Sequence, residues 1–143
     1  RPRRSGAPIL SSRRKAASAG SARPYRDIDL PIQQILPSVL EHCRSTSADL
    51  VLQAPTGAGK TTVVPLALLD GGMVNGKVIV LQPRRITCIS VAQRMAELWG
   101  ESIGETVGYR IRHEAIVSNR TRIEVVTEGV LLRMLGQNPD LEG

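Results

Sequence analysis

The feature that most constrains the fold is the run Ala54-Pro55-Thr56-Gly57-Ala58-Gly59-Lys60-Thr61, which has the form A-x-x-x-x-G-K-T. An apolar, strand-like run at 49–53 precedes it, and a helix-like run at 61–69 follows it. Small residues between a strand and a helix let consecutive backbone N–H groups turn toward phosphate oxygens. The helix that begins near Lys60 points the positive end of its dipole at the same place. The sequence therefore predicts a phosphate-binding loop.

The residue types within this loop predict separate roles. Gly57 and Gly59 allow a close approach and unusual backbone dihedrals. Lys60 is expected to reach the β- and γ-phosphates of a nucleoside triphosphate, and the Thr61 hydroxyl to bind Mg²⁺, so these two are the candidate catalytic residues. Ala54 stands where the strict pattern has Gly, and it fits if it keeps ordinary β-type dihedrals. The alternative is a Gly-rich turn that binds nothing.

The net charge of +6 is concentrated at the start of the chain. Residues 1–26 hold eight of the 19 basic residues and none of the 13 acidic ones, so the remainder has a net charge of −2. This segment is rich in Arg, Ser, Ala, Gly and Pro and shows no apolar period, which predicts disorder. It is interpreted as a linker, a transit-peptide-like segment or a basic nucleic-acid-binding arm, and residues 27–143 as the folded part. The compartment stays open between the cytoplasm and an organelle.

The fold is further limited by the cysteine content, the aromatic content and the hydropathy of the chain. Cys43 and Cys88 make neither a metal-binding spacing nor a disulfide framework, so both are expected to be buried or half-buried thiols in a reducing compartment. Aromatic residues make up 2% of the chain and Phe is absent, which predicts an aliphatic core. No apolar run approaches the roughly 18 residues of a membrane span.

Strand and helix patterns alternate along the chain, which predicts an α/β fold with a parallel sheet. The expected strands are 48–53, 77–82, 107–112 and 121–126, and the expected helices are 30–43, 61–69, 86–99 and 130–135. Pro37 is expected to kink or break the first helix. Gly100 closes the helix 86–99, whose predicted buried face holds Ile86, Ile89, Ala92 or Gln93, and Ala96.

Three loops, at 54–61, 82–85 and 127–129, each follow a predicted strand. The carboxyl ends of parallel strands meet at one edge of a sheet, so these loops are predicted to lie there together. Arg84 and Arg85 offer forked donors suited to phosphate oxygens.

Thr127 offers a hydroxyl and Gly129 an open backbone N–H, and both groups commonly bind phosphate. Less specific roles are a solvated helix start for Arg85 and a dipole-capping role for Glu128.

The three motifs in this order, with their spacing, resemble the first RecA-like domain of the DEAH-box (DExH, RHA-type) RNA helicases. The resemblance covers about residues 30–143. It is closest to the HrpB branch in the runs Leu52 to Thr62, Val107-Gly108-Tyr109-Arg110 and Ile123 to Gly129. It implies a P-loop NTPase that uses ATP and Mg²⁺ and moves 3′-to-5′ on RNA.

The resemblance also implies which residues bind which ligand. The nucleotide would contact Ala54, Pro55, Thr56, Gly57, Ala58, Gly59, Lys60, Thr61, Thr62 and, by stacking on the base, Arg94. The RNA backbone would contact Gln82, Pro83, Arg84, Arg85, Thr127, Glu128 and Gly129.

The helicase interpretation requires parts that these 143 residues do not contain. The family's D-E-x-H motif is expected soon after Gly143, and a second RecA-like domain with arginine fingers is required in cis. We therefore expect a fragment that neither hydrolyses ATP nor unwinds RNA alone, and that folds poorly because its sheet lacks strands. The alternatives are another P-loop ATPase, such as a DNA motor or a transport ATPase, and a non-catalytic remnant that binds nucleotide or nucleic acid.

Overall fold

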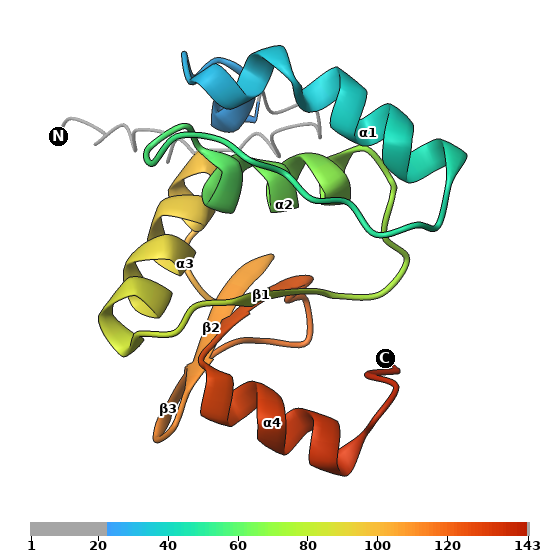
Figure 1. Ribbon diagram of the computed structural model, residues 1–143. Helices are drawn as coiled ribbons and strands as arrows, with labels where there is room; N and C mark the ends of the chain where they lie inside the picture. Colours follow the sequence, from blue (N-terminus) through green and yellow to red (C-terminus); the bar gives the residue numbers. More distant parts are fainter. Residues whose placement is uncertain (1–22, 143) are drawn as a thin grey trace, which may run out of the picture.

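The computed structural model describes residues 23–142, and this part is an α/β fold built on a four-stranded sheet (Figure 1). The strand order is β1-β4-β2-β3, with β1 at Val78–Leu81, β2 at Val107–Ile111, β3 at Glu114–Ile116 and β4 at Ile123–Val126. Strand β4 is parallel to both of its neighbours. All four of its residues are buried, as expected for a near-continuous apolar run in the middle of a parallel sheet. The predicted fold class is confirmed.

Helices cover the sheet on two sides (Figure 1). Their bounds are α1 Leu36–Ser45, α2 Lys60–Asp70, α3 Arg85–Trp99 and α4 Glu128–Gln137. Figure 1 shows α1 and α2 above the sheet and α4 below it. Helix α3 packs against β2, β4 and α2, and it ends at Gly100 in the left-handed conformation, as the sequence predicts. No helix in residues 23–142 combines the length and the apolar character that crossing a membrane requires.

The core between α2, α3 and the sheet is mostly aliphatic, but the aromatic residues also take part in it. Trp99, Tyr25 and Tyr109 are all buried. Cys88 is fully buried and Cys43 is half-buried, and both are free thiols, in agreement with the prediction. Burial raises the pKa of the Cys88 thiol to about 11. This thiol is therefore a core group and not a nucleophile at neutral pH.

The predicted strand at 48–53 does not form in the described structure, where this segment belongs to no ladder. Val51 is 93% exposed, although the sequence places it in an apolar run. A strand needs the backbone groups of a neighbour, and among the described strands β1 is an edge that pairs only with β4. Sequence composition shows the apolar run but does not show whether a partner lies beside it.

Two helix predictions also need correction. Residues 30–43 form a short 3-10 helix, η2 at Pro31–Gln34, and then α1, so the break falls before Pro37, which sits in the first turn of α1. The buried face of α3 is Cys88, Ala92, Met95, Ala96, Leu98 and Trp99. Ile86, which was predicted to be buried, is 82% exposed because it lies in the first turn, beside the arginine loop at the rim of the sheet.

Residues 23–26, the described part of the segment predicted to be disordered, differ from that prediction. Residues 1–22 of the segment predicted to be disordered lie outside the described residues. Pro24–Arg26, in contrast, form the 3-10 helix η1, and Tyr25 is buried against α3. The four residues 23–26 therefore belong to the folded part, anchored by an aromatic side chain that compositional reasoning overlooks.

Candidate functional site

The phosphate loop has the backbone geometry that its glycines predict. Gly57 has φ +82° and Gly59 has φ +95°, both in the region that favours glycine. Among residues 23–142, Leu141 is the one non-glycine residue with positive φ, so Ala54 fits in the place of the usual Gly. Gly59 precedes the first residue of α2, and no side chain of residues 23–142 caps that end of the helix. The free N–H groups of the first helical turn remain available to a ligand.

The side chain of Lys60 folds back across this loop. Its Nζ atom donates a hydrogen bond of 2.6 Å to the carbonyl oxygen of Ala54, and the residue is half-buried. An ammonium group has three donors, so this bond leaves two of them for other acceptors. This hydrogen bond thus holds the cation at the loop.

A cavity of about 390 Å³ opens beside the loop. It is lined by Leu30, Thr56, Gly57, Gly59, Lys60, Thr61, Thr62 and Arg94. The structure therefore brings Arg94, which is 34 residues away from Lys60 and lies on α3, to the phosphate loop. The guanidinium of Arg94 forms an exposed ion pair of 3.2 Å with Glu97. Ala54, Pro55 and Ala58 belong to the loop but do not line the cavity.

The second and third predicted loops lie side by side. Parallel pairing aligns Leu81 of β1 with Val126 of β4, and the backbone N–H of Gln82 donates to the carbonyl of Val126 at 2.9 Å. Arg84 and Arg85 follow as exposed residues at the start of α3, and Thr127 directly follows Val126. These two motifs share one rim of the sheet, as predicted.

Two details of that prediction need correction. Glu128 and Gly129 are the first residues of α4 and not part of a loop, because the helix begins directly after Thr127. The phosphate loop does not join the other two loops at the end of a paired strand, because segment 48–53 is outside the ladder. Helix α3 makes the connection instead, since it starts beside Arg84 and carries Arg94 to the phosphate loop.

The hairpin of β2 and β3 adds basic residues that the sequence analysis did not select. A cavity of about 520 Å³ lies between Arg84, Arg85, Ile86 and Ile89 on one side and Ile111 and Glu114 of the hairpin on the other. A second one, of about 320 Å³, lies between the hairpin and α4 and includes Arg110, Arg112 and Arg133. Arg110 and Arg112 alternate along a predicted strand, so their placement on one face was available from the sequence.

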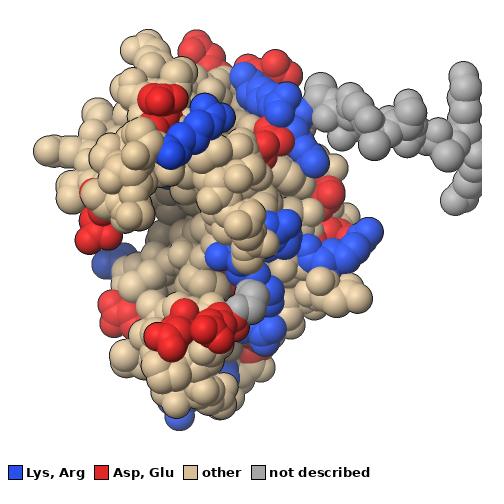
Figure 2. Space-filling model, turned by 90° about the vertical axis from the view of Figure 1, so that its right-hand side faces the viewer, with Lys and Arg blue, Asp and Glu red and all other residues tan. Residues whose placement is uncertain are grey.

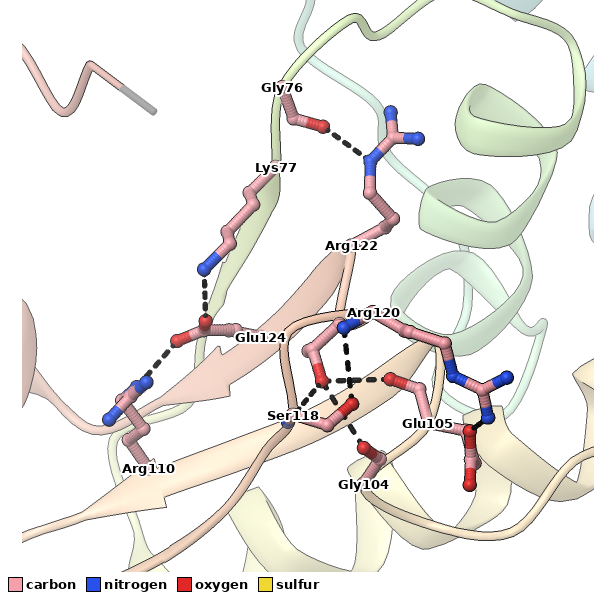
Figure 3. A network of polar contacts seen from close by, with 10 residues as sticks. Gly76, Lys77, Gly104, Glu105, Arg110, Ser118, Arg120, Arg122 and Glu124 are labelled. Carbon is pink, nitrogen blue, oxygen red and sulfur yellow. Dashed lines mark hydrogen bonds and ion pairs between the residues drawn. The ribbon is translucent and has the colours of Figure 1, made fainter.

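A buried carboxylate holds these strands together (Figure 3). Glu124, in the middle of β4, accepts hydrogen bonds from Lys77 Nζ at 2.8 Å and from Arg110 Nε at 2.7 Å, and its side chain is 2% exposed. Burial alone would raise the pKa of Glu124, but the two cationic donors outweigh it and hold that pKa below its ordinary value. An acidic residue within the apolar run Ile123 to Val126 was the sequence signal for this group.

Another cavity, of about 520 Å³, contains none of the predicted site residues. It lies between β1 and α4 and is lined by Lys77, Ile79, Met134, Gln137, Asn138, Leu141 and Glu142. Figure 2 shows one face of the molecule, which is hollowed and carries both basic and acidic side chains. The lining of this cavity holds one basic residue, Lys77, and one acidic residue, Glu142.

Comparison with known families and proteins gives a consistent result. A family model described as DEAD/DEAH box helicase matches residues 31–142. The ATP-dependent RNA helicase HrpB of Escherichia coli (strain K12) is 50% identical over 114 residues, which are 80% of this chain and 14% of that protein. The ATP-dependent RNA helicase HrpA of Borreliella burgdorferi is 40% identical over 110 residues, or 76% of this chain and 13% of that protein.

Solved structures agree with the sequence matches. The crystal structure of the E. coli DEAH/RHA helicase HrpB superimposes on this chain with a TM-score of 0.75 and 50% sequence identity. The superposition covers 80% of this chain and 14% of the HrpB chain. The resemblance found from the motifs is therefore confirmed. The chain spans only about 14% of the length of these relatives.

Proposed function

Because the chain belongs to the DEAD/DEAH box helicase family, we propose that it supplies ATP phosphate binding and RNA-backbone contacts to an ATP-dependent RNA helicase. The whole protein would couple ATP hydrolysis to movement along RNA and to its unwinding. The observation that carries this proposal is the course of α3. The helix starts at the arginine loop and carries Arg94 to the cavity beside the phosphate loop, so one rigid element joins the two proposed ligand sites.

The residues around the cavity fit a nucleotide. The left-handed glycines and the uncapped start of α2 offer backbone N–H groups to phosphate oxygens, and Lys60 adds a cation. In the proposed complex, Lys60 gives phosphate oxygens the donors that Ala54 does not use. Thr61 lines the same cavity, and its hydroxyl would hold Mg²⁺. Bound Mg²⁺ supplies charge neutralisation for the phosphates.

Arg94 is the residue we assign to the base. Its guanidinium is exposed and, among the described residues, forms one ion pair, with Glu97 on the same helix. Arg94 also lines the cavity beside the phosphate loop. A planar guanidinium stacks on a base without reading the hydrogen-bonding edge of that base. Such a contact gives affinity for nucleotides with little preference among them.

The RNA-binding surface we propose is the rim formed by Gln82–Arg85 and Thr127–Gly129, and we add Arg112 and Arg133. Arginine side chains and backbone N–H groups bind phosphate oxygens and carry no sequence information. A protein that moves along RNA needs contacts of this kind, because every position on the strand must be equivalent. Glu124 supports this surface because its ion pairs join β4 to Arg110 of β2 and to Lys77, which directly precedes β1.

Hydrolysis of ATP requires groups other than the nucleotide-binding and RNA-binding residues proposed above. Phosphoryl transfer depends on positioning and on stabilisation of the transferred charge. In this family we assign that role to a D-E-x-H motif and to a second RecA-like domain acting in cis. The present residues bind and orient the phosphates and the RNA strand.

The test separates the two ligands. Lys60→Ala should abolish ADP binding in calorimetry while RNA binding and the circular dichroism spectrum stay unchanged. An Arg84→Ala, Arg85→Ala double variant should show the reverse, with ADP binding intact and RNA affinity reduced. Unchanged ADP affinity in Lys60→Ala would refute the nucleotide site.

A further inference from the structure

The cavity beside the phosphate loop has an apolar wall, which cannot bind phosphate groups. Of the described residues that line the cavity, besides the loop and Arg94, Leu30 is the one with an aliphatic side chain. Leu30 is half-buried, so part of its surface remains free to meet a ligand. Its Cδ1 atom also lies 2.8 Å from the place where a Cβ on Gly59 would stand. Leu30 directly precedes the residues that the family model matches.

Leu30 is the last residue of the segment 23–30, which we call the N-terminal arm. Contacts made by the first residues of this arm hold the arm in place. Tyr25 stacks on Trp99 with ring centroids 6.2 Å apart and planes 6° apart, and the Arg23 guanidinium lies 3.8 Å from the centre of a Trp99 ring. Asp70, the last residue of α2, accepts hydrogen bonds from the Tyr25 hydroxyl and from Arg26, whose Nη2 atom is 2.6 Å away. The arm is thus tied to the ends of α2 and α3.

A second set of bonds ties the residues that follow the arm to the phosphate loop and back to the arm itself. The backbone N–H of Ile32 donates to the carbonyl of Ala58 at 3.1 Å, and the side chain of Gln33 donates to the carbonyl of Tyr25 at 2.5 Å. Leu30 therefore lies between two anchors, one at each end of α2. Such a residue is held in place before a ligand arrives, which lowers the entropic cost of a contact.

We propose that Leu30 contacts the nucleoside part of the nucleotide that binds in this cavity, an inference that rests on the nucleotide binding proposed above. A nucleotide offers anionic oxygens at its phosphates and apolar surface only at its sugar carbons and the faces of its base. The backbone N–H groups of the loop and the Lys60 side chain bind the phosphates. Leucine has no hydrogen-bonding group, so its contact is apolar and adds affinity without selecting a particular base.

Calorimetric titration of the full chain with ADP and with inorganic pyrophosphate, both with Mg²⁺, tests this assignment. Leu30→Ala should weaken ADP binding about four- to fifteenfold, the factor that one or two buried methyl groups contribute, and leave pyrophosphate binding within about twofold. Leu30→Met, which keeps an apolar side chain, should bind ADP as the wild type does. Leu40→Ala is the matched control, because Leu40 is a partly buried leucine that lies beside Gly71 at the other end of α2.

The outcomes are distinct. A selective loss of ADP affinity in Leu30→Ala, with Leu40→Ala unchanged, supports the contact. Equal losses for ADP and pyrophosphate overturn it, because Leu30 would then act only by shaping the loop around Gly59. Unchanged ADP affinity in Leu30→Ala, measured on a variant with wild-type thermal unfolding, also overturns it. ADP binding that survives Lys60→Ala would remove the nucleotide site itself and this inference with it.

Discussion

Replacing Gly59 by alanine is expected to destabilise the protein much more than the same change at Gly57. Both residues have positive φ, +95° at Gly59 and +82° at Gly57. Their surroundings differ. A Cβ at Gly59 would lie 2.8 Å from Leu30 Cδ1 and 3.0 Å from Ile32 Cγ2, whereas a Cβ at Gly57 would meet no atom of the described residues within 4 Å. Comparing the two alanine variants therefore separates the free-energy cost of backbone strain from the cost of steric overlap.

The expected free energies follow from these two terms. A left-handed alanine costs about 1–2 kcal/mol at either position. Overpacking adds about 1–3 kcal/mol, and it applies only at Gly59. Gly57→Ala should thus lose about 1–2 kcal/mol and Gly59→Ala about 2–5 kcal/mol. The larger loss is a large share of the roughly 5–15 kcal/mol by which a folded domain is stable.

Urea unfolding followed by circular dichroism measures both losses, and Trp99, the one tryptophan of the sequence, gives a second probe by fluorescence. Adding Leu30→Ala to Gly59→Ala removes one of the two nearest overlaps. The double variant should therefore be about 1 kcal/mol more stable than the sum of the single effects predicts. Equal midpoints for Gly57→Ala and Gly59→Ala, or strict additivity in the double variant, would refute this reasoning.

Three further predictions concern charge and catalysis. The folded-state pKa of Glu124 lies below its ordinary value of 4.5, so its ionised form stabilises the fold above that pH, and this contribution is lost as the pH falls through the folded-state pKa. Glu124→Gln should therefore flatten the acid limb of a stability curve measured by urea unfolding at pH 2 to 7, about the range in which carboxylates titrate. Single substitutions Arg84→Ala and Arg85→Ala should each weaken RNA binding equally across sequences and lower the slope of log affinity against log salt by about one. Residues 1–143 alone should show no RNA-stimulated phosphate release from ATP, because the sequence contains no D-E-x-H motif.

Each of these has a clear contrary result. Glu97→Gln is the control for Glu124, since Glu97 is 67% exposed in its ion pair, and an acid limb that changes equally in both variants would contradict the role of the buried carboxylate. RNA affinity that depends on base sequence after either arginine change would contradict a backbone contact. A robust ATPase rate from residues 1–143 would show that the chain holds hydrolytic groups that we have not identified.

The sequence by itself determined the local chemistry of this protein. The phosphate loop, the glycines within it, the arginine loop after β1 and the Gly that ends α3 are all short-range features. Each depends on what a few neighbouring residues allow the backbone to do, so each can be predicted without knowing what packs around it. The same motifs, by their order and spacing, were sufficient to identify the family.

The tertiary structure decided which of these pieces meet. It placed Arg94 at the phosphate loop and Leu30 beside Gly59, and it joined Tyr25 to Trp99 across 74 positions of the chain. It also left residues 48–53 outside the sheet, although their composition predicts a strand. The physical reason is the same in each case. Pairing and burial are properties of two segments together, and the residues of one segment do not reveal which partner lies beside it.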